Sequence, residues 1–456
     1  MTKKILFGTV VLMTAAVCWA NGNAGLAEDN AQLRRRIEKL EKEIEELKRI
    51  AERQARPAKV ATEDARSAAS PRLEEAALQK DAARMPTDVA AKKPVVSDLD
   101  IELYGYIKLD AIYDTSRMDN GNYARWVESE AVNDDDDEFN MTANETRLGM
   151  RISGPPVSDA RTSGRVEIDF YGGGSENKSR VMMRHAYMNI DWPEAHLNII
   201  AGQTSDVISP LNPSTLNYSV AWWAGNIGYR RPQVRLTKSW ALAGDVELRV
   251  EGALARTIGI TTTPDFTPGD AGEDAGFPGV QARASVVFPL LGYKPTTFGV
   301  SGHRAEEELD LDGTGRHKDF DSWSLNLDFE QPINEWMTVE GEMFTGENLS
   351  AYLGGIGQGV NTTTLQEIGS QGGWIAAALG PWDKCRFNVG ATVDDADSSD
   401  LNLGDRTLNR TVFGNVFYSI NKNTEFGFEL SHWRTEYIGQ GDGDSVRAQA
   451  SLIYRF

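Results

Sequence analysis

Hydrophobic and polar residues alternate along most of the chain after residue 100, with the two-residue period of β-strands. The pattern is clearest at the end of the chain, where one face carries Val446, Ala448, Ala450, Leu452, Tyr454 and Phe456 and the other carries Arg447, Gln449, Ser451 and Arg455. Ile453 is the one apolar residue on the polar face. Unpaired sheet edges promote aggregation, so we expect this last strand to pair with the first strand of the same sheet. An edge strand of a soluble β-domain is the alternative.

The same alternation predicts an all-β domain of sixteen antiparallel strands over residues 99–456. The predicted strands are 101–114, 143–153, 161–171, 180–192, 196–205, 227–238, 244–256, 279–288, 295–308, 318–330, 335–347, 370–380, 384–394, 407–420, 423–437 and 443–456. Their connections alternate in length. The connections on one side of the sheet are 115–142, 172–179, 206–226, 257–278, 309–317, 348–369, 395–406 and 438–442, of which 115–142, 206–226, 257–278 and 348–369 are long; on the other side, Asn421-Lys422 is a two-residue turn. Short turns on one side and long loops on the other are typical of an outer-membrane β-barrel, and a C-terminal aromatic residue such as Phe456 is typical as well.

In such a barrel the apolar face of each strand contacts lipid and the polar face lines the lumen. The alternation predicts lumen-facing basic residues on five positions, which are Lys108, Arg147, Arg151, Arg165 and Arg249. Aromatic residues at or beside the short turns are expected to form a periplasmic girdle; they are Trp192, Trp240, Phe288, Trp336 and Trp382. Strand 180–192 has an ambiguous phase, because Arg184 shares a face with Ala186, Met188 and Ile190.

The N-terminus has the features of a secretory signal peptide. Lys3 and Lys4 precede an apolar run that ends at Ala20, so we expect residues 1–20 to be removed. Cys18 lies within this leader, which leaves Cys385 alone and excludes an intrachain disulfide in the mature protein. The even strand number places both ends of the barrel at the periplasmic side of the outer membrane.

Residues 21–56 carry a heptad pattern that predicts an α-helical coiled coil in the periplasm. The core positions are Leu26, Asn30, Leu33, Ile37, Leu40, Ile44, Leu47 and Ala51. Isoleucine at a with leucine at d favours two strands, but Arg36 before a and Glu41 after d resemble a short trimerisation motif. We expect three strands and hence a homotrimer; a solvated single helix is the alternative. Residues 57–98, rich in Ala, Lys, Asp, Glu and Pro, are predicted to be a flexible periplasmic linker.

Composition and motifs argue against several other functions. The net charge of −20 argues against a nucleic-acid partner. The five histidines form no zinc-binding pattern, Gly354 to Gly359 matches no phosphate-binding fingerprint, and no nucleophile elbow is present, so we predict no metal, no cofactor and no enzymatic activity. The acidic run Asp134 to Glu138 either binds a divalent cation near the lipopolysaccharide surface or is a solvated loop, which is the more common case.

The third long loop and the strand after it contain the main candidate site. Two prolines and the pair Trp222-Trp223 are followed by Arg230, Arg231 and Arg235. Arginine clusters give channels their selectivity for anions, and arginine binds carboxylates in a bidentate manner. The alternative is that these arginines only form ion pairs with acidic residues of the lumen.

The chain resembles the DcaP-like porins in its order of leader, heptads and barrel. The resemblance also rests on four segments, Ala201 to Ser205, Arg231 to Leu236, Thr345 to Gly355 and Val412 to Tyr418. It implies a trimeric outer-membrane channel for dicarboxylates, in which the third long loop folds inward and narrows the pore. By position only, the family's anion-binding arginines would correspond to Arg230, Arg231 and Arg235.

The leading hypothesis is therefore a passive porin for small anionic solutes, surrounded by outer-membrane lipid and lipopolysaccharide. A sugar porin is the second hypothesis, since Trp222 and Trp223 are able to stack on sugar rings. In a third, structural hypothesis the coiled coil tethers the outer membrane to peptidoglycan or periplasmic proteins.

Overall fold

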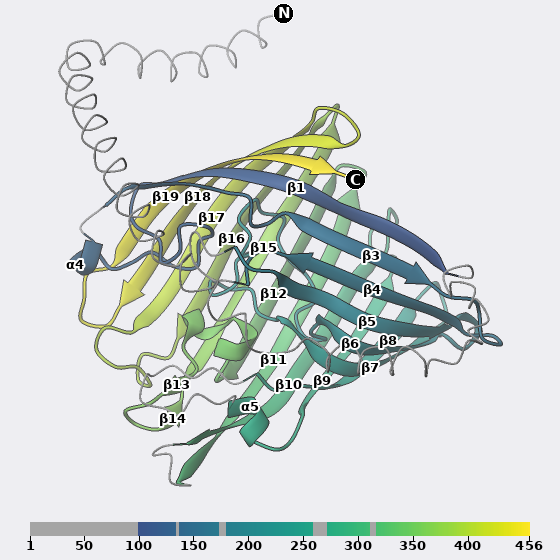
Figure 1. Cartoon of the computed structure of the whole chain (residues 1–456), viewed down its shortest axis with the longest axis horizontal. Helices are drawn as coiled ribbons and strands as arrows, with labels where there is room; N and C mark the ends of the chain where they lie inside the picture. Colours follow the sequence, from purple (N-terminus) through teal and green to yellow (C-terminus); the bar gives the residue numbers. More distant parts are fainter. Residues whose placement is uncertain (1–98, 134–135, 173–178, 259–270, 311–315) are drawn as a thin grey trace, which may run out of the picture. The chain divides into compact units, whose positions relative to one another are not determined.

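The computed structural model describes residues 99–456 except 134–135, 173–178, 259–270 and 311–315. This part of the chain is dominated by one antiparallel sheet that closes on itself (Figure 1). The predicted signal peptide, coiled coil and linker, with the proposed trimerisation residues Asn30 to Leu47, lie outside the described residues.

The strands of the barrel are β1 (Asp100–Asp114), β2 (Glu138–Thr142), β3 (Arg147–Ser153), β4 (Arg161–Asp169), β5 (Met182–Trp192), β6 (Leu197–Ser205), β7 (Arg230–Ala241), β8 (Glu247–Ala255), β9 (Gly279–Phe288), β10 (Thr296–Asp310), β11 (His317–Asn334), β12 (Met337–Glu347), β15 (Gly369–Trp382), β16 (Cys385–Ala396), β17 (Arg406–Ser419), β18 (Thr424–Tyr437) and β19 (Gly443–Arg455). Short elements in the connections are α4 (Glu130–Asn133), η2 (Pro193–Ala195), α5 (Ala271–Asp274), η3 (Ser350–Tyr352), η4 (Gly355–Gly357), β13 (Val360–Asn361) and β14 (Gln366–Glu367).

The barrel has sixteen strands, because β2 and β3 are two halves of one strand. Both halves pair with the same edge of β1: β2 with Asp110 to Asp114, and β3 with Asp100 to Tyr106. The seventeen strands of the sheet therefore count as sixteen around the barrel, as the alternation predicted. The predicted start of this strand at residue 143 was wrong. The strand begins at Glu138, and a turn at Ala143 to Thr146, whose ends are joined by a backbone hydrogen bond of 3.0 Å, interrupts its pattern.

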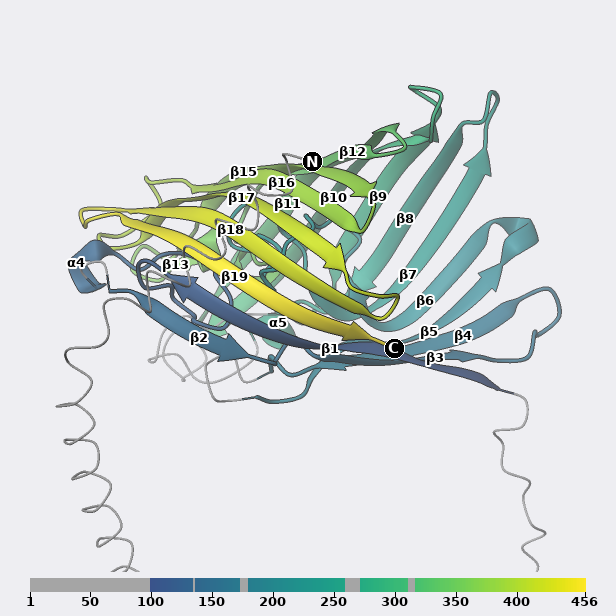
Figure 2. The same ribbon diagram turned by 90° about the horizontal axis from the view of Figure 1, so that it is seen from above.

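The seam of the barrel lies between the first and last strands, which run side by side in Figure 2. Ala111 of β1 pairs with Ala450 of β19, and the backbone groups of Gly105 and Phe456 exchange two hydrogen bonds of 3.1 Å. The predicted closure by the C-terminal strand is thus confirmed. Closure leaves this sheet without a free edge, which is the condition for placing strands in lipid.

The two faces of the sheet have the polarity of a membrane barrel. On β19 the apolar Leu452 is 50% exposed, whereas the polar Gln449 is 2% exposed and faces inward. Trp240, Trp336 and Trp382 are exposed beside the short turns, where the girdle was expected, and the rings of the last two lie 5.8 Å apart. None of the described helices is long and apolar enough to cross a membrane.

Candidate functional site

The third long loop, residues 206–229, crosses the lumen from one wall to the other. Its backbone contacts side chains of widely separated strands: Val207 N–H donates to Gln281 of β9 (2.8 Å), and the carbonyl of Leu216 accepts from Lys108 of β1 (2.8 Å) and from Gln449 of β19 (2.9 Å). The inward path implied by the resemblance is therefore present.

Two leucines of this loop anchor it to the far wall in the same way. The N–H of Leu211 donates to the Glu342 carboxylate (2.8 Å), and the N–H of Leu216 donates to the Glu429 carboxylate (2.7 Å). Each side chain also packs against apolar residues that point into the lumen: Leu211 contacts Trp374, Ala376 and Phe413, whereas Leu216 contacts Phe417 and Ile453. Packing of the side chain and a hydrogen bond from the backbone to an acidic side chain thus act on the same residue.

The wall opposite Leu216 is shaped to receive this side chain. A Cβ atom added at Gly427 of β18 would lie 2.7 Å from a Leu216 methyl group, so the absence of a side chain there provides the space. Ile453, the exception in the alternation of the last strand, is 3% exposed and forms part of this socket. The sequence irregularity therefore marks the point where the loop is anchored.

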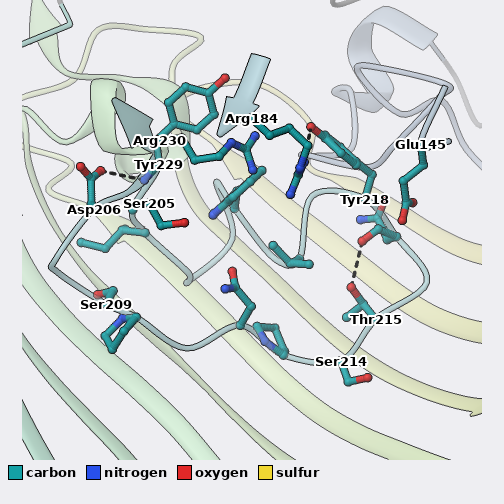
Figure 3. A pocket seen from close by; sticks show the side chains of 18 of the residues that line it. Glu145, Arg184, Ser205, Asp206, Ser209, Ser214, Thr215, Tyr218, Tyr229 and Arg230 are labelled. Atoms are coloured by element: carbon teal, nitrogen blue, oxygen red, sulfur yellow. Dashed lines mark hydrogen bonds between the residues drawn. The ribbon is translucent and has the colours of Figure 1, made fainter. Parts of the chain in front are cut away.

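On its other side, the loop and the wall of β1, β3 and β5 enclose a cavity of about 360 Å³ (Figure 3). The wall contributes Tyr106, Glu145, Arg147 and Arg184; the loop and the start of β7 contribute Asp206, Tyr218, Trp222, Tyr229 and Arg230. Positive and aromatic groups therefore meet at the narrowed part of the lumen.

Arg230 is the least compensated charge of this cavity. Its side chain lies over the rings of Trp222 (5.3 Å) and Tyr229 (5.0 Å), and the residue is 5% exposed. The buried Nη2 atom has no hydrogen-bond partner within the described part of the chain. Cation–π contacts orient the guanidinium without satisfying its N–H donors, and among the described residues no carboxylate pairs with it.

Arg184 also reaches the cavity, and sequence reasoning missed it. A register shift between Glu167 and Ile168 of the neighbouring β4 places a bulge at this point of β5, so Arg184 and His185 both point inward. Arg184 donates to Glu167 (2.9 Å) and to Asp169 (2.7 Å). The ambiguous phase of strand 180–192 was the only sign of this bulge in the sequence.

The carboxylate of Glu167 is the centre of an arginine cluster on this wall. Besides Arg184, it contacts Arg165 at 2.5 Å and Arg147 at 3.6 Å. Three guanidinium groups thus share two carboxylates, those of Glu167 and Asp169, which leaves one positive charge in excess.

Arg231 and Arg235 lie outside the cavity. Arg231 is fully buried, pairs with Asp206 at 2.7 Å, donates to the carbonyl of Ala351 (3.0 Å) and lies 3.8 Å from the ring of Tyr352. It thereby joins the third loop to the loop at 348–368, and its acidic partner is Asp206 of the third loop. Burial raises the pKa of the Tyr352 phenol to about 12, so this ring stays neutral.

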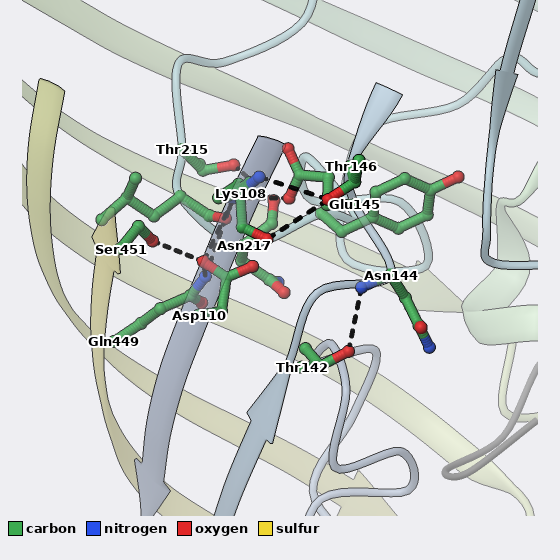
Figure 4. A network of polar contacts seen from close by, with 12 residues as sticks. Lys108, Asp110, Thr142, Asn144, Glu145, Thr146, Thr215, Asn217, Gln449 and Ser451 are labelled. Atoms are coloured by element: carbon green, nitrogen blue, oxygen red, sulfur yellow. Dashed lines mark hydrogen bonds and ion pairs between the residues drawn. The ribbon is translucent and has the colours of Figure 1, made fainter. Parts of the chain in front are cut away.

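Arg235 and three further predicted lumen charges are occupied by neighbours. Arg235 donates to Gln233 (3.0 Å) lower on the wall. Lys108 contacts Glu145 (2.5 Å) and Asp110 (3.4 Å) behind the loop (Figure 4). Arg151 pairs with Glu102 (3.0 Å) and Arg249 with Glu247 (3.8 Å), both near the short-turn end of the barrel.

Aromatic residues of three loops form one cluster, part of which lines the cavity. Neighbouring ring centroids lie 4.0 to 6.3 Å apart among Tyr123, Tyr171, Tyr218, Trp222, Trp223 and Tyr229. Trp223 does not line the cavity but lies beneath Arg125 (5.2 Å). Four tyrosines of this cluster were missed, because loop residues carry no periodic signal.

The acidic run of the first long loop is only partly described. Residues 134–135 lie outside the described residues, and Glu138 pairs with Arg117 at 3.3 Å. Within the described residues, the one group with the spacing of metal ligands is Glu308, His317 and Asp319, whose ligand atoms lie within 4.8 Å of one another at the ends of β10 and β11.

Comparisons with known proteins agree with this architecture. Residues 21–252 match the sequence model of the family described as DcaP outer membrane protein. The crystal structure of the outer membrane channel DcaP of Acinetobacter baumannii superposes with a TM-score of 0.64 at 18% identity, covering 79% of this chain and 98% of that one. The anion-selective porin from Comamonas acidovorans has a TM-score of 0.51 at 11% identity, covering 79% and 100% of the two chains. No curated protein sequence matches.

Proposed function

The chain belongs to the DcaP outer membrane protein family and is an outer membrane porin, and we propose that it conducts small anions, dicarboxylates in particular, by passive diffusion past the third loop. The preference for dicarboxylates comes from the family resemblance. The preference for anions rests on the charges around the cavity.

The observation that carries the proposal is the uncompensated guanidinium of Arg230. The cavity is lined by three arginines and two carboxylates, but each carboxylate is paired with a cation outside the lining: Glu145 with Lys108 (2.5 Å) and Asp206 with Arg231 (2.7 Å). Of the three arginines, Arg147 and Arg184 are themselves paired with Glu167 and Asp169, so Arg230 is the lining charge that has no ion-pair partner among the described residues. A permeating anion that loses part of its hydration is stabilised by such groups and still leaves if binding stays weak.

Replacement of Arg230 by alanine tests the proposal. In planar bilayers under a salt gradient, we expect the reversal potential to shift toward cation selectivity and succinate flux to fall more than the flux of a neutral solute of similar size. The shift should shrink at 1 M salt, where the Debye length is about 3 Å. Arg230→Lys should keep most of the selectivity.

Arg249→Ala is the matched control, because Arg249 also faces the lumen but lies half-exposed near the barrel end beside Glu247. Its effect on the reversal potential should be smaller. If Arg230→Ala keeps the wild-type reversal potential and succinate flux, the anion preference is refuted.

A sugar porin is the second candidate, and the aromatic cluster of the three loops favours it. Its rings mainly contact one another, however, at distances such as 4.0 Å between Tyr171 and Tyr218, instead of forming an open ladder. Competition experiments with maltose-type oligosaccharides distinguish the two candidates, since block of the ion current by sugar at millimolar concentration would favour the second.

The quaternary structure belongs to the same proposal. The heptads of residues 21–56 and the motif from Arg36 to Glu41 support a homotrimer with a periplasmic coiled coil. A tether to peptidoglycan or periplasmic proteins is the structural alternative for this segment. Loss of envelope cohesion with intact conductance in a variant lacking residues 21–96 would favour the tether.

A further inference from the structure

A groove of about 820 Å³ runs across the outer face of the barrel, from β11 to β18. Its walls are exposed apolar side chains, among them Met343, Ile375, Val393 and Val412. Its floor is made by residues with little or no side chain, including Gly373. A Cβ atom added at Gly373 would lie 2.5 Å from the backbone carbonyl oxygen of Glu342. The two neighbouring strands thus leave no room for a side chain at this position, and the floor of the groove stays open.

One end of the groove carries a cation, Arg410, which points outward from β17. Its side chain is 53% exposed, and its only ion pair within the described residues is a loose one to Glu436 at 3.9 Å. The neighbouring Arg434 is better neutralised, since it pairs with Asp442 at 2.7 Å, and the His432 ring contacts Asp444 at 3.0 Å. Arg410 is therefore the basic group of this face that remains available to an external anion.

The position of Arg410 along the barrel corresponds to the outer leaflet of the membrane. β17 enters the barrel from the long connection at 397–405, and Arg410 lies near that end. From Arg410 toward the short-turn end, the outward-facing residues of β17 are apolar or small as far as Tyr418. On the neighbouring strands, the residues paired with Arg410 are Val393 on one side and Arg434 on the other. Arg410 thus marks the level where the apolar band gives way to charged groups.

We propose that this surface binds a phosphorylated lipid of the outer leaflet, of the lipid A type, with its phosphate on Arg410 and an acyl chain in the groove. Arginine suits this role because its planar guanidinium binds phosphate oxygens in a bidentate manner. A protein partner fits less well, since the groove is apolar and the charged groups beside Arg410 are already paired with one another. The proposal depends on the outer-membrane location of the barrel and not on the anion selectivity of its lumen.

Binding of purified bis-phosphorylated lipid A to the full-length protein in detergent tests the proposal, with bound lipid counted by native mass spectrometry. Arg410→Ala should weaken binding about fivefold, the factor that corresponds to the loss of one basic side chain at an anionic membrane surface. Ala391→Phe should also weaken binding, because Ala391 lines the groove and a ring there fills it without changing any charge.

The matched control is Arg304→Ala. Arg304 is an exposed arginine on β10 that pairs with Asp321 at 2.8 Å and lies outside the groove, so its replacement should leave binding unchanged. Heat modifiability on gels verifies that each variant is folded. Unchanged binding in Arg410→Ala, an equal loss in Arg304→Ala, or equal affinity for dephosphorylated lipid A would each overturn the proposal. An unchanged reversal potential in Arg410→Ala separates this site from the anion preference of the lumen.

Discussion

Replacement of Leu216 by alanine should loosen the constriction without unfolding the barrel. Leu216 is 1% exposed and is held by the socket of Phe417 and Ile453. A buried leucine replaced by alanine costs about 2–5 kcal/mol. Because Leu216 belongs to the loop and not to the sheet, this cost falls on the attachment of the loop tip. A loss of about 3 kcal/mol changes the ratio of released to attached loop roughly a hundredfold.

Single-channel recording measures this change directly. We expect Leu216→Ala to show larger current fluctuations, and liposome swelling should show a higher size limit for neutral solutes. Leu216→Met, which keeps the volume, should behave nearly as the wild type. Leu327→Ala is the control, because Leu327 is a leucine on the outer face of β11 and is 50% exposed. Wild-type fluctuations and size limit in Leu216→Ala would show that this socket does not hold the loop.

The remaining predictions concern stability and assembly. Arg231→Ala should lower the temperature at which the protein loses its folded gel mobility. The substitution leaves the buried Asp206 carboxylate without its ion-pair partner, which destabilises the folded state by about 3–5 kcal/mol. Arg235→Ala should have little effect on this temperature. Unboiled protein should migrate anomalously on gels, and recovery from the soluble periplasmic fraction would contradict a membrane barrel. The isolated 21–56 peptide should have the mass of a trimer in solution, and a dimer would refute the three-stranded register. Deletion of residues 21–96 should leave the single-channel conductance unchanged.

The barrel could be predicted from the sequence because each strand carries its own signal. The period of two, the polarity of the faces and the alternation of short and long connections are local properties, and together they led to the correct strand number and closure. The error at Glu138 to Thr142 has a local cause as well. The turn at Ala143 to Thr146 breaks the pattern, so the upper half of the strand was assigned to the loop.

The site could be predicted only in part, because it depends on contacts between distant segments. Arg230 and Arg231 are adjacent in sequence, yet one lines the cavity and the other is fully buried against Asp206. Alternation places the two on opposite faces of an ideal strand, but the inward loop buries both. Arg184 was not predicted to face the lumen, because a β-bulge depends on how two strands pair, and the sequence of one strand does not give this register.

The net charge of the whole chain does not determine the charge of the passage. A chain with a net charge of −20 would be expected to favour cations, if its carboxylates faced the permeating ion freely. On the far wall, however, Glu342 and Glu429 accept backbone N–H groups of the third loop and are fully engaged in holding it. On the near wall, two carboxylates are shared by three arginines, and Arg230 has none. The loop that narrows the lumen thus occupies acidic groups of the far wall and leaves Arg230 without an ion pair among the described residues, which is the arrangement on which the proposed anion preference rests.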